Sequence, residues 1–90
     1  MTTPRDDDIA AKILELLAAR APGATICPSD AARALASDEA AWRALMPQVR
    51  RAAATLAAAG KLRVTQHGED VDALAARGPI RLGRPPASPP

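Results

Sequence analysis

Apolar residues recur at helical spacing in the first part of the chain, directly after a run of acidic residues. The apolar positions are Ile9, Ile13, Leu16 and Leu17. Their spacing of three or four residues places them on one face of a helix. The carboxylates of residues 6–8 favour a helix start, because they can cap free N–H groups at the positive end of the helix dipole. Pro22 and Gly23 cannot continue the helix, which is therefore predicted from Asp6 to about Arg20.

A longer pattern of the same kind predicts a helix from about Asp38 to Ala59. The residues of its apolar face are Trp42, Leu45, Val49, Ala52 and Leu56. The place of Trp42 on this face favours packing at the core or its rim over stacking on a nucleic-acid base. Pro47 is expected to kink this helix or to mark the start of its straight part. Gly60 is expected to end the helix as its C′ residue.

Two short elements are predicted between these helices. The run 25–27 contains β-branched residues and is long enough only for a minimal strand. Ser29 is a good N-cap, so a short helix is predicted over residues 30–36.

The last part of the chain has the alternation of polar and apolar residues that is typical of strands. Residues 61–66 and 79–82 alternate in this way and predict two half-buried strands. Residues 67–70 are expected to form a turn, and residues 72–76 one helical turn closed by Gly78. The apolar positions are Leu62, Val64, Ile80 and Leu82. If these face the core, the outer face of the hairpin carries Lys61, Arg63 and Arg81.

The predicted order is helix, short strand, helix, helix, strand, loop, strand, which is the order of a winged helix: a helix-turn-helix followed by a β-hairpin. The predicted fold class is therefore mostly α with a small β-hairpin (α+β). It consists of three helices and a two- or three-stranded antiparallel sheet. The domain is expected over residues 6–84, with disordered segments at residues 1–5 and in the Pro-rich tail 85–90.

Four stretches of this sequence also resemble a known family. They are TICPS (25–29), WRALMP (42–47), VTQHG (64–68) and GPIRL (78–82). They are similar to a group of small bacterial proteins filed as domain of unknown function 3253, and the resemblance runs from about Ile9 to Arg84. It implies a winged-helix fold in a stand-alone bacterial protein. It implies no activity, so no catalytic or ligand residue is carried over.

Charge is distributed unevenly along the chain, although the net charge is only +2. Between Glu39 and Glu69 there is no acidic residue, while five basic residues fall in this segment. They are Arg43, Arg50, Arg51, Lys61 and Arg63. Clustered positive charge on a small domain indicates a polyanion or an acidic protein surface as partner.

Two functions are compatible with this charge. In a helix-turn-helix the second helix lies in the major groove, so Arg43, Arg50 and Arg51 on the outward helix face are candidates to bind duplex DNA. Residues 61, 63 and 81 of the hairpin could hold phosphates beside the groove, or could be ordinary strand-edge charge. The acidic residues 69–72 would repel phosphates at the wing tip. The alternative is a protein-interaction module that docks an acidic partner, and a homodimer is possible but does not follow from the sequence.

Catalytic, metal and cofactor chemistry has little support in the sequence. Cys27 is the only cysteine, which excludes an internal disulfide, and it is expected to be buried as a small apolar side chain. His67 is expected to be a turn residue. One Cys and one His cannot complete a zinc site without carboxylates. No motif of an enzyme or cofactor site is present, so we expect no enzyme.

No apolar run could span a bilayer, and the start is polar, so a cytoplasmic location is expected.

Overall fold

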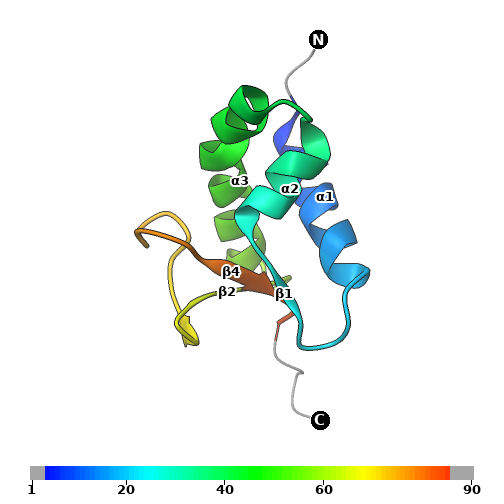
Figure 1. Ribbon diagram of the computed structural model, residues 1–90. Coiled ribbons are helices and arrows are strands. Elements are labelled where there is room, and N and C mark those ends of the chain that lie inside the picture. Colours follow the sequence, from blue (N-terminus) through cyan, green and yellow to red (C-terminus); the bar gives the residue numbers. More distant parts are fainter. Residues whose placement is uncertain (1–3, 86–90) are drawn as a thin grey trace.

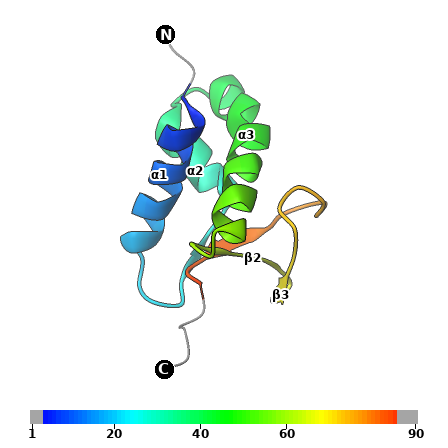
Figure 2. The same ribbon diagram turned by 180° about the vertical axis from the view of Figure 1, so that it is seen from behind.

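The computed structural model describes residues 4–85 as three helices and four strands, and so confirms the predicted α+β class. The helices are α1 (Asp6–Ala18), α2 (Pro28–Leu35) and α3 (Glu39–Ala58). The strands are β1 (Thr25–Ile26), β2 (Arg63–Gln66), β3 (Glu69–Asp70) and β4 (Arg81–Gly83). The helices lie together at one end of the molecule, and the sheet lies at the other end (Figures 1 and 2).

The sheet is antiparallel throughout, with the strand order β1-β4-β2-β3. It has one strand more than the two or three predicted, because the turn after β2 is shorter than expected. His67 and Gly68 both have positive φ angles, 53° and 84°, which is the geometry of a two-residue hairpin turn. Glu69 and Asp70 therefore pair with the end of β2, and the prediction of a four-residue turn over 67–70 was wrong.

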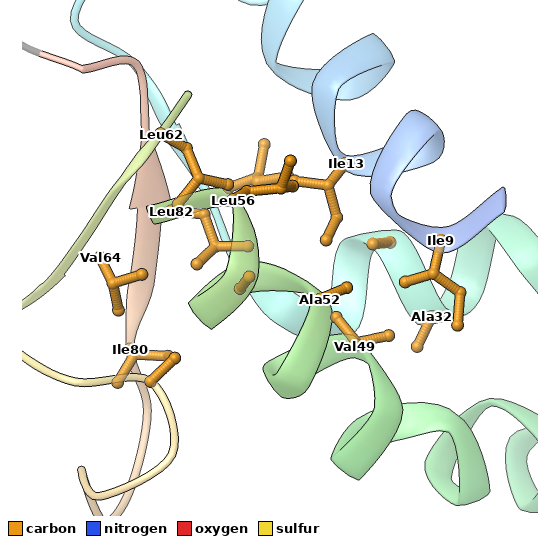
Figure 3. Packing of buried hydrophobic residues seen from close by; sticks show 14 of the residues in the cluster. Ile9, Ile13, Ala32, Val49, Ala52, Leu56, Leu62, Val64, Ile80 and Leu82 are labelled. Carbon is orange, nitrogen blue, oxygen red and sulfur yellow. The ribbon is translucent and has the colours of Figure 1, made fainter. Parts of the chain in front are cut away.

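The core lies between the helices and the inner face of the sheet (Figure 3). Its largest fully buried side chains are Ile9, Ile13, Val49, Ile80 and Leu82. The apolar positions predicted for the two strands, 62, 64, 80 and 82, are all buried. Small residues such as Ala31, Ala32 and Ala53 are also completely buried, so the helices pack closely without aromatic side chains. Trp42 is half-buried at the rim of this core, as its spacing predicted.

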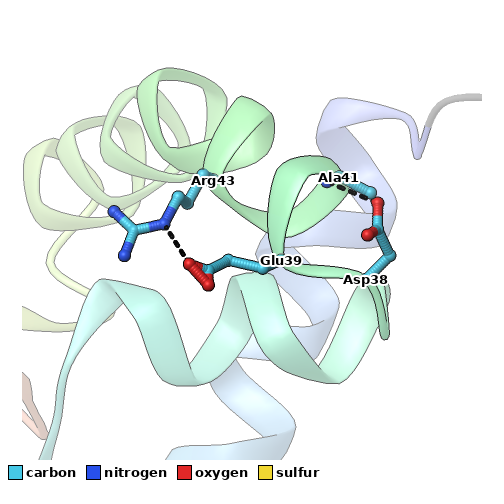
Figure 4. Close-up of polar contacts among 4 residues, drawn as sticks. All are labelled: Asp38, Glu39, Ala41 and Arg43. Atoms are coloured by element: carbon cyan, nitrogen blue, oxygen red, sulfur yellow. Dashed lines mark hydrogen bonds and ion pairs between the residues drawn. The ribbon is translucent and has the colours of Figure 1, made fainter.

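Local signals set both ends of α3. The Asp38 carboxylate accepts a hydrogen bond from the Ala41 amide at 3.0 Å and caps the first turn (Figure 4). At the other end Gly60 has a φ of 75°, and the Lys61 amide donates to the Leu56 carbonyl at 2.9 Å. This bond closes a Schellman motif. The helix continues through Pro47, which lies inside it.

The start of α2 differs from the prediction. The helix begins at Pro28, with Cys27 in the N-cap position, and Ser29 lies inside the first turn. The Asp30 carboxylate accepts a hydrogen bond from the Cys27 amide at 2.8 Å. Proline fits the first helical position because its missing N–H would have no partner there. Ser29 was therefore wrongly predicted as the N-cap.

The predictions for the two ends of the chain concern mostly residues outside the described range. Residues 1–3 and 86–90 are not described, and the expected disorder of these segments falls on them. At the start, α1 begins at Asp6 as predicted, and it ends at Ala18, two residues earlier than Arg20. No helix within residues 4–85 is long and apolar enough to cross a membrane.

Candidate nucleic-acid interface

The outward face of α3 is the predicted reading surface, and its basic residues have different surroundings. Arg43 and Arg51 are exposed, and so is Pro47 between them. Arg50, at the edge of this face, is only partly exposed. The buried residues of α3 lie on the opposite side, as the apolar spacing predicted. Of the three arginines predicted on this face, Arg43 and Arg51 are therefore exposed to solvent.

Arg50 binds its own chain. Its guanidinium donates to the carbonyl of Ala76 at 3.1 Å and to that of Gly78 at 2.7 Å, with a longer contact of 3.4 Å to the Ala73 carbonyl. These acceptors belong to the loop between β3 and β4, more than 20 residues further along the chain. Arg50 thus holds this loop against α3, and a partner would have to compete with three carbonyl groups for its donors.

Arg43 contacts Glu39 and the Trp42 ring at the corner between α2 and α3. Its Nε donates to the Glu39 carboxylate at 3.2 Å (Figure 4), and its Cζ lies 5.0 Å from the centroid of the Trp42 ring. Arg33 of α2 also lies over this ring, with its Cζ 4.6 Å from the centroid. Both distances are within the range of cation–π attraction. We call Arg33, Trp42 and Arg43 the corner cluster.

The sequence analysis did not single out Arg33. Nothing in the local pattern of α2 distinguishes it from a basic residue on a solvated helix face. The available signal was Trp42, the only aromatic side chain of the protein, which must pack against something near the start of α3. Which residue of α2 lies over it depends on the packing of the two helices.

Arg51 lies one turn beyond Pro47 and faces acidic residues. It lines a hollow of about 280 Å³ together with Asp6 and Asp7 from the start of α1. Carboxylates this close reduce the positive potential that Arg51 offers to a phosphate. Arg43 is likewise paired with the Glu39 carboxylate, so what distinguishes the corner cluster is its second cation, Arg33, on the same ring.

The three basic residues predicted on the hairpin do not lie beside the corner cluster. Lys61 is exposed three residues after the end of α3. Arg63 and Arg81 lie on the outer face of the sheet, since their neighbours Val64 and Leu82 point into the core. Arg63 pairs with Asp70 on β3. The six predicted site residues thus divide between the outward side of α3 and a separate surface of the sheet.

Arg81 is bound to β1 and to the residue that follows it. It donates to the Thr25 hydroxyl at 2.8 Å, to the Thr25 carbonyl at 3.1 Å and to the Cys27 sulfur. Cys27 is partly exposed, so the prediction of a buried apolar cysteine was wrong. Arg81 supplies the reason, because its guanidinium gives the sulfur a polar neighbour. Within residues 4–85, no group of three or more His, Cys, Asp or Glu side chains could hold a metal ion.

Comparison with known proteins gives a family without an assigned activity. A family model described as a protein of unknown function (DUF3253) matches residues 6–85, which is nearly the whole of the described chain. No curated protein matches the chain. The match agrees with the resemblance found in the four sequence stretches and carries no site residues of its own.

Proposed function

The chain belongs to the DUF3253 family of proteins of unknown function, and we propose that it is a winged-helix domain that binds duplex DNA through the corner between α2 and α3. The order of elements supports the winged helix, because a strand lies between the first two helices and a hairpin follows the third. The pairing of β1 with β4 and of β4 with β2 supports it as well. On this proposal the protein acts in the cytoplasm, without a catalytic activity or a cofactor.

The corner cluster is the observation that carries the proposal. In helix-turn-helix proteins, residues near the start of the second helix contact base edges, while the first helix crosses the phosphate backbone. Arg43 lies in the second turn of α3, and Arg33 lies on the preceding helix. The Trp42 ring orders both guanidinium groups before a ligand arrives. Less side-chain entropy is then lost on binding, which favours affinity.

The remainder of the outward α3 face suits the same role. Ala40, Ala44 and Pro47 are exposed and small, so a groove wall can approach the helix closely. Arg51 extends the basic face by two further turns beyond Arg43. Arg50 contributes indirectly, by holding the loop that lies beside α3.

Fluorescence anisotropy of a labelled duplex at low salt tests the proposal. The variant Arg33→Gln/Arg43→Gln removes both cations of the corner cluster, and the control Arg5→Gln/Lys12→Gln removes two cations from α1 and the residue before it. We expect wild-type binding in the micromolar range and a salt slope of about −0.9 for each phosphate contact. The corner variant should therefore flatten the slope by about two units, whereas the control variant should change it little.

Two outcomes would contradict the proposal. The first is the absence of binding by wild-type protein at about 100 μM, the weak end of ordinary non-specific affinity. The second is equal loss of affinity in the corner variant and the control variant, since this would indicate a response to net charge alone. Circular dichroism of both variants separates these outcomes from unfolding.

The alternative function, docking of an acidic protein partner, is favoured by a different observation. Leu74 in the loop beside α3 is 61% exposed. It borders a mostly apolar hollow of about 480 Å³, with Met46, Pro47 and Arg51 on the α3 side. A partner that places an apolar side chain in this hollow and a carboxylate near Arg51 would fit. If Leu74→Gln abolishes capture of a partner from nuclease-treated lysate while wild type fails to bind DNA, this alternative replaces the first proposal.

A further inference from the structure

The outer face of the sheet carries a second basic surface, which the DNA proposal does not use. A hollow of about 440 Å³ opens there, on the side of the sheet that turns away from the core. Its lining includes Gly23, Thr25, Arg63, Thr65, Gly83 and Arg84. None of the residues that line it comes from α2 or α3. We call it the sheet hollow.

A glycine forms the floor of the sheet hollow. Gly83 lies in the central strand β4 and pairs with Thr25 on one side and with Arg63 on the other. Its φ is not among the positive values of this chain, so the backbone conformation does not require glycine. A Cβ added at Gly83 would lie 3.2 Å from the Thr25 methyl carbon. Glycine inside a strand is unfavourable and commonly marks a place where a ligand or another backbone approaches closely.

Two arginines, Arg63 and Arg84, line the hollow, and two more, Arg20 and Arg81, bind the lining residue Thr25. Arg20 donates to the Thr25 carbonyl at 2.9 Å, and Arg84 donates to the carbonyls of residues 17, 18 and 20 at 2.9–3.2 Å. Arg81 donates to the Thr25 carbonyl and to two uncharged side-chain atoms, the Thr25 hydroxyl and the Cys27 sulfur. A carbonyl fixes a guanidinium in place but carries no full negative charge. The fourth, Arg63, is the only one of the four that is paired with a carboxylate within the described chain. The surface therefore keeps a charge of about +3 in a fixed arrangement, which favours an anion.

Donors suited to phosphate remain available at the hollow. Among residues 4–85, the hydrogen bonds of Arg63 use only its Nε, and those of Arg84 use only one terminal nitrogen. Their remaining N–H groups can bind phosphate oxygens in the paired geometry that guanidinium favours. The Thr65 hydroxyl adds a further donor beside them. The volume lies in the range of small-molecule sites.

We propose that the sheet hollow binds the phosphate group of a nucleotide-sized phosphorylated molecule. Arg63 and Arg84 contact the phosphate, Arg20 and Arg81 supply charge behind them, and the missing side chain of Gly83 leaves room for it. The phosphate of a nucleic-acid backbone offers the same chemistry, so the experiment has to separate the two sources.

The test is a titration of the full chain with inorganic pyrophosphate at constant ionic strength, followed by two-dimensional ¹H–¹⁵N NMR. We expect saturable shifts confined to the lining amides, such as those of residues 23, 25, 65 and 83. Arg63→Gln should weaken binding about tenfold, the usual effect of losing a charged hydrogen bond. Arg77→Gln, which removes a cation from the loop beside α3, is the matched control and should bind as wild type does.

A second variant fills the floor of the hollow without removing a charge. Gly83→Ala is made together with Thr25→Ser, because serine lacks the methyl that the new Cβ would meet and keeps the hydroxyl that Arg81 binds. We expect this double variant to remain folded, as judged from its spectrum, and to bind pyrophosphate at least about tenfold more weakly than Thr25→Ser alone.

Three results would overturn the proposal. They are the absence of saturation by about 20 mM pyrophosphate, shifts spread over all arginine-rich surfaces, and wild-type affinity in both Arg63→Gln and Gly83→Ala/Thr25→Ser. If a short oligonucleotide shifts the lining amides and pyrophosphate does not, the hollow binds nucleic-acid backbone and the small-molecule assignment is wrong. The corner variant Arg33→Gln/Arg43→Gln should bind pyrophosphate normally, so the DNA proposal can fail independently.

Discussion

Replacing Arg50 by methionine separates a structural role of this residue from a role in binding DNA. Methionine keeps an aliphatic chain of similar course and removes the guanidinium. The hydrogen bonds to the carbonyls of Ala76 and Gly78, at 3.1 and 2.7 Å, are then lost. The contact to Ala73, at 3.4 Å, lies at the limit of hydrogen bonding and is left out of the estimate.

The expected cost follows from these two bonds. A hydrogen bond to a charged group contributes about 1.5–3 kcal/mol, and the partial exposure of Arg50 favours the lower end because water replaces part of what is lost. We therefore expect Arg50→Met to lower the free energy of unfolding by about 2–3 kcal/mol. A domain of this size has about 4–12 kcal/mol in total, so the loss is a substantial fraction of it.

Urea unfolding followed by circular dichroism measures the change. With a slope of about 1–1.5 kcal/mol/M, the midpoint should fall by about 2 M at unchanged slope. Hydrogen exchange should show where the loss arises, because the amides of Ala75 and Ala76 bond to the Asp72 carbonyl inside the loop. Their protection should decrease more than that of the α3 amides. Gln66 still holds the end of the loop through the carbonyls of Arg77 and Pro79.

Arg50→Lys is the matched control, since it restores the charge without the planar fork of donors. A single ammonium group cannot reproduce the arrangement that binds several carbonyls, so lysine should recover less than half of the lost stability. The reasoning would be refuted if Arg50→Met kept the wild-type midpoint. It would also be refuted if Arg50→Met lost DNA affinity as the corner variant does while the loop amides stayed protected, because Arg50 would then be an interface residue.

Three smaller changes test the fold itself. Leu56→Ala should cost about 2–4 kcal/mol by urea unfolding, because this side chain is 7% exposed, and an unchanged midpoint would place it outside the core. Asp38→Ala should cost about 1 kcal/mol by removing the cap of α3, whereas Asp38→Asn should cost much less. His67→Asn should raise stability by about 0.5 kcal/mol, because asparagine tolerates the positive φ of this position better, and a loss of stability would contradict the turn geometry.

The sequence predicted those parts of the fold that depend on neighbouring residues. The start and end of α3 follow from Asp38 and Gly60, whose capping bonds join residues at most five positions apart. The buried side of the same helix follows from the spacing of its apolar residues. The start of α2 was predicted wrongly because two helix-start signals, Pro28 and Ser29, are adjacent in the sequence. The helix begins at the proline, which fits the first helical position, and not after Ser29.

The candidate site was less accessible to prediction because its geometry depends on contacts between distant residues. Helical periodicity places Arg50 on the outward face of α3, yet its guanidinium binds carbonyl groups of a loop 23–28 positions further along the chain. Arg33 gained its significance through the packing of α2 on Trp42. The surroundings of Arg81 depend on the pairing of β4 with β1, which joins residues 56 positions apart. Helical spacing carries no information on which loop or strand will cover a given surface.

The position of β4 has a consequence for folding during synthesis. This strand is the last element along the described chain, yet it lies in the centre of the sheet between β1 and β2. The ribosome makes the chain from its N-terminus, so all three helices are synthesised before the strand that joins β1 to β2. Until then Ile26 and Val64 lack Leu82, their shared partner in the finished sheet. Arg84 follows and binds the end of α1, 67 positions earlier. The domain is therefore completed in one late step, and a chain interrupted before Arg81 leaves the ribosome as a substrate for proteases.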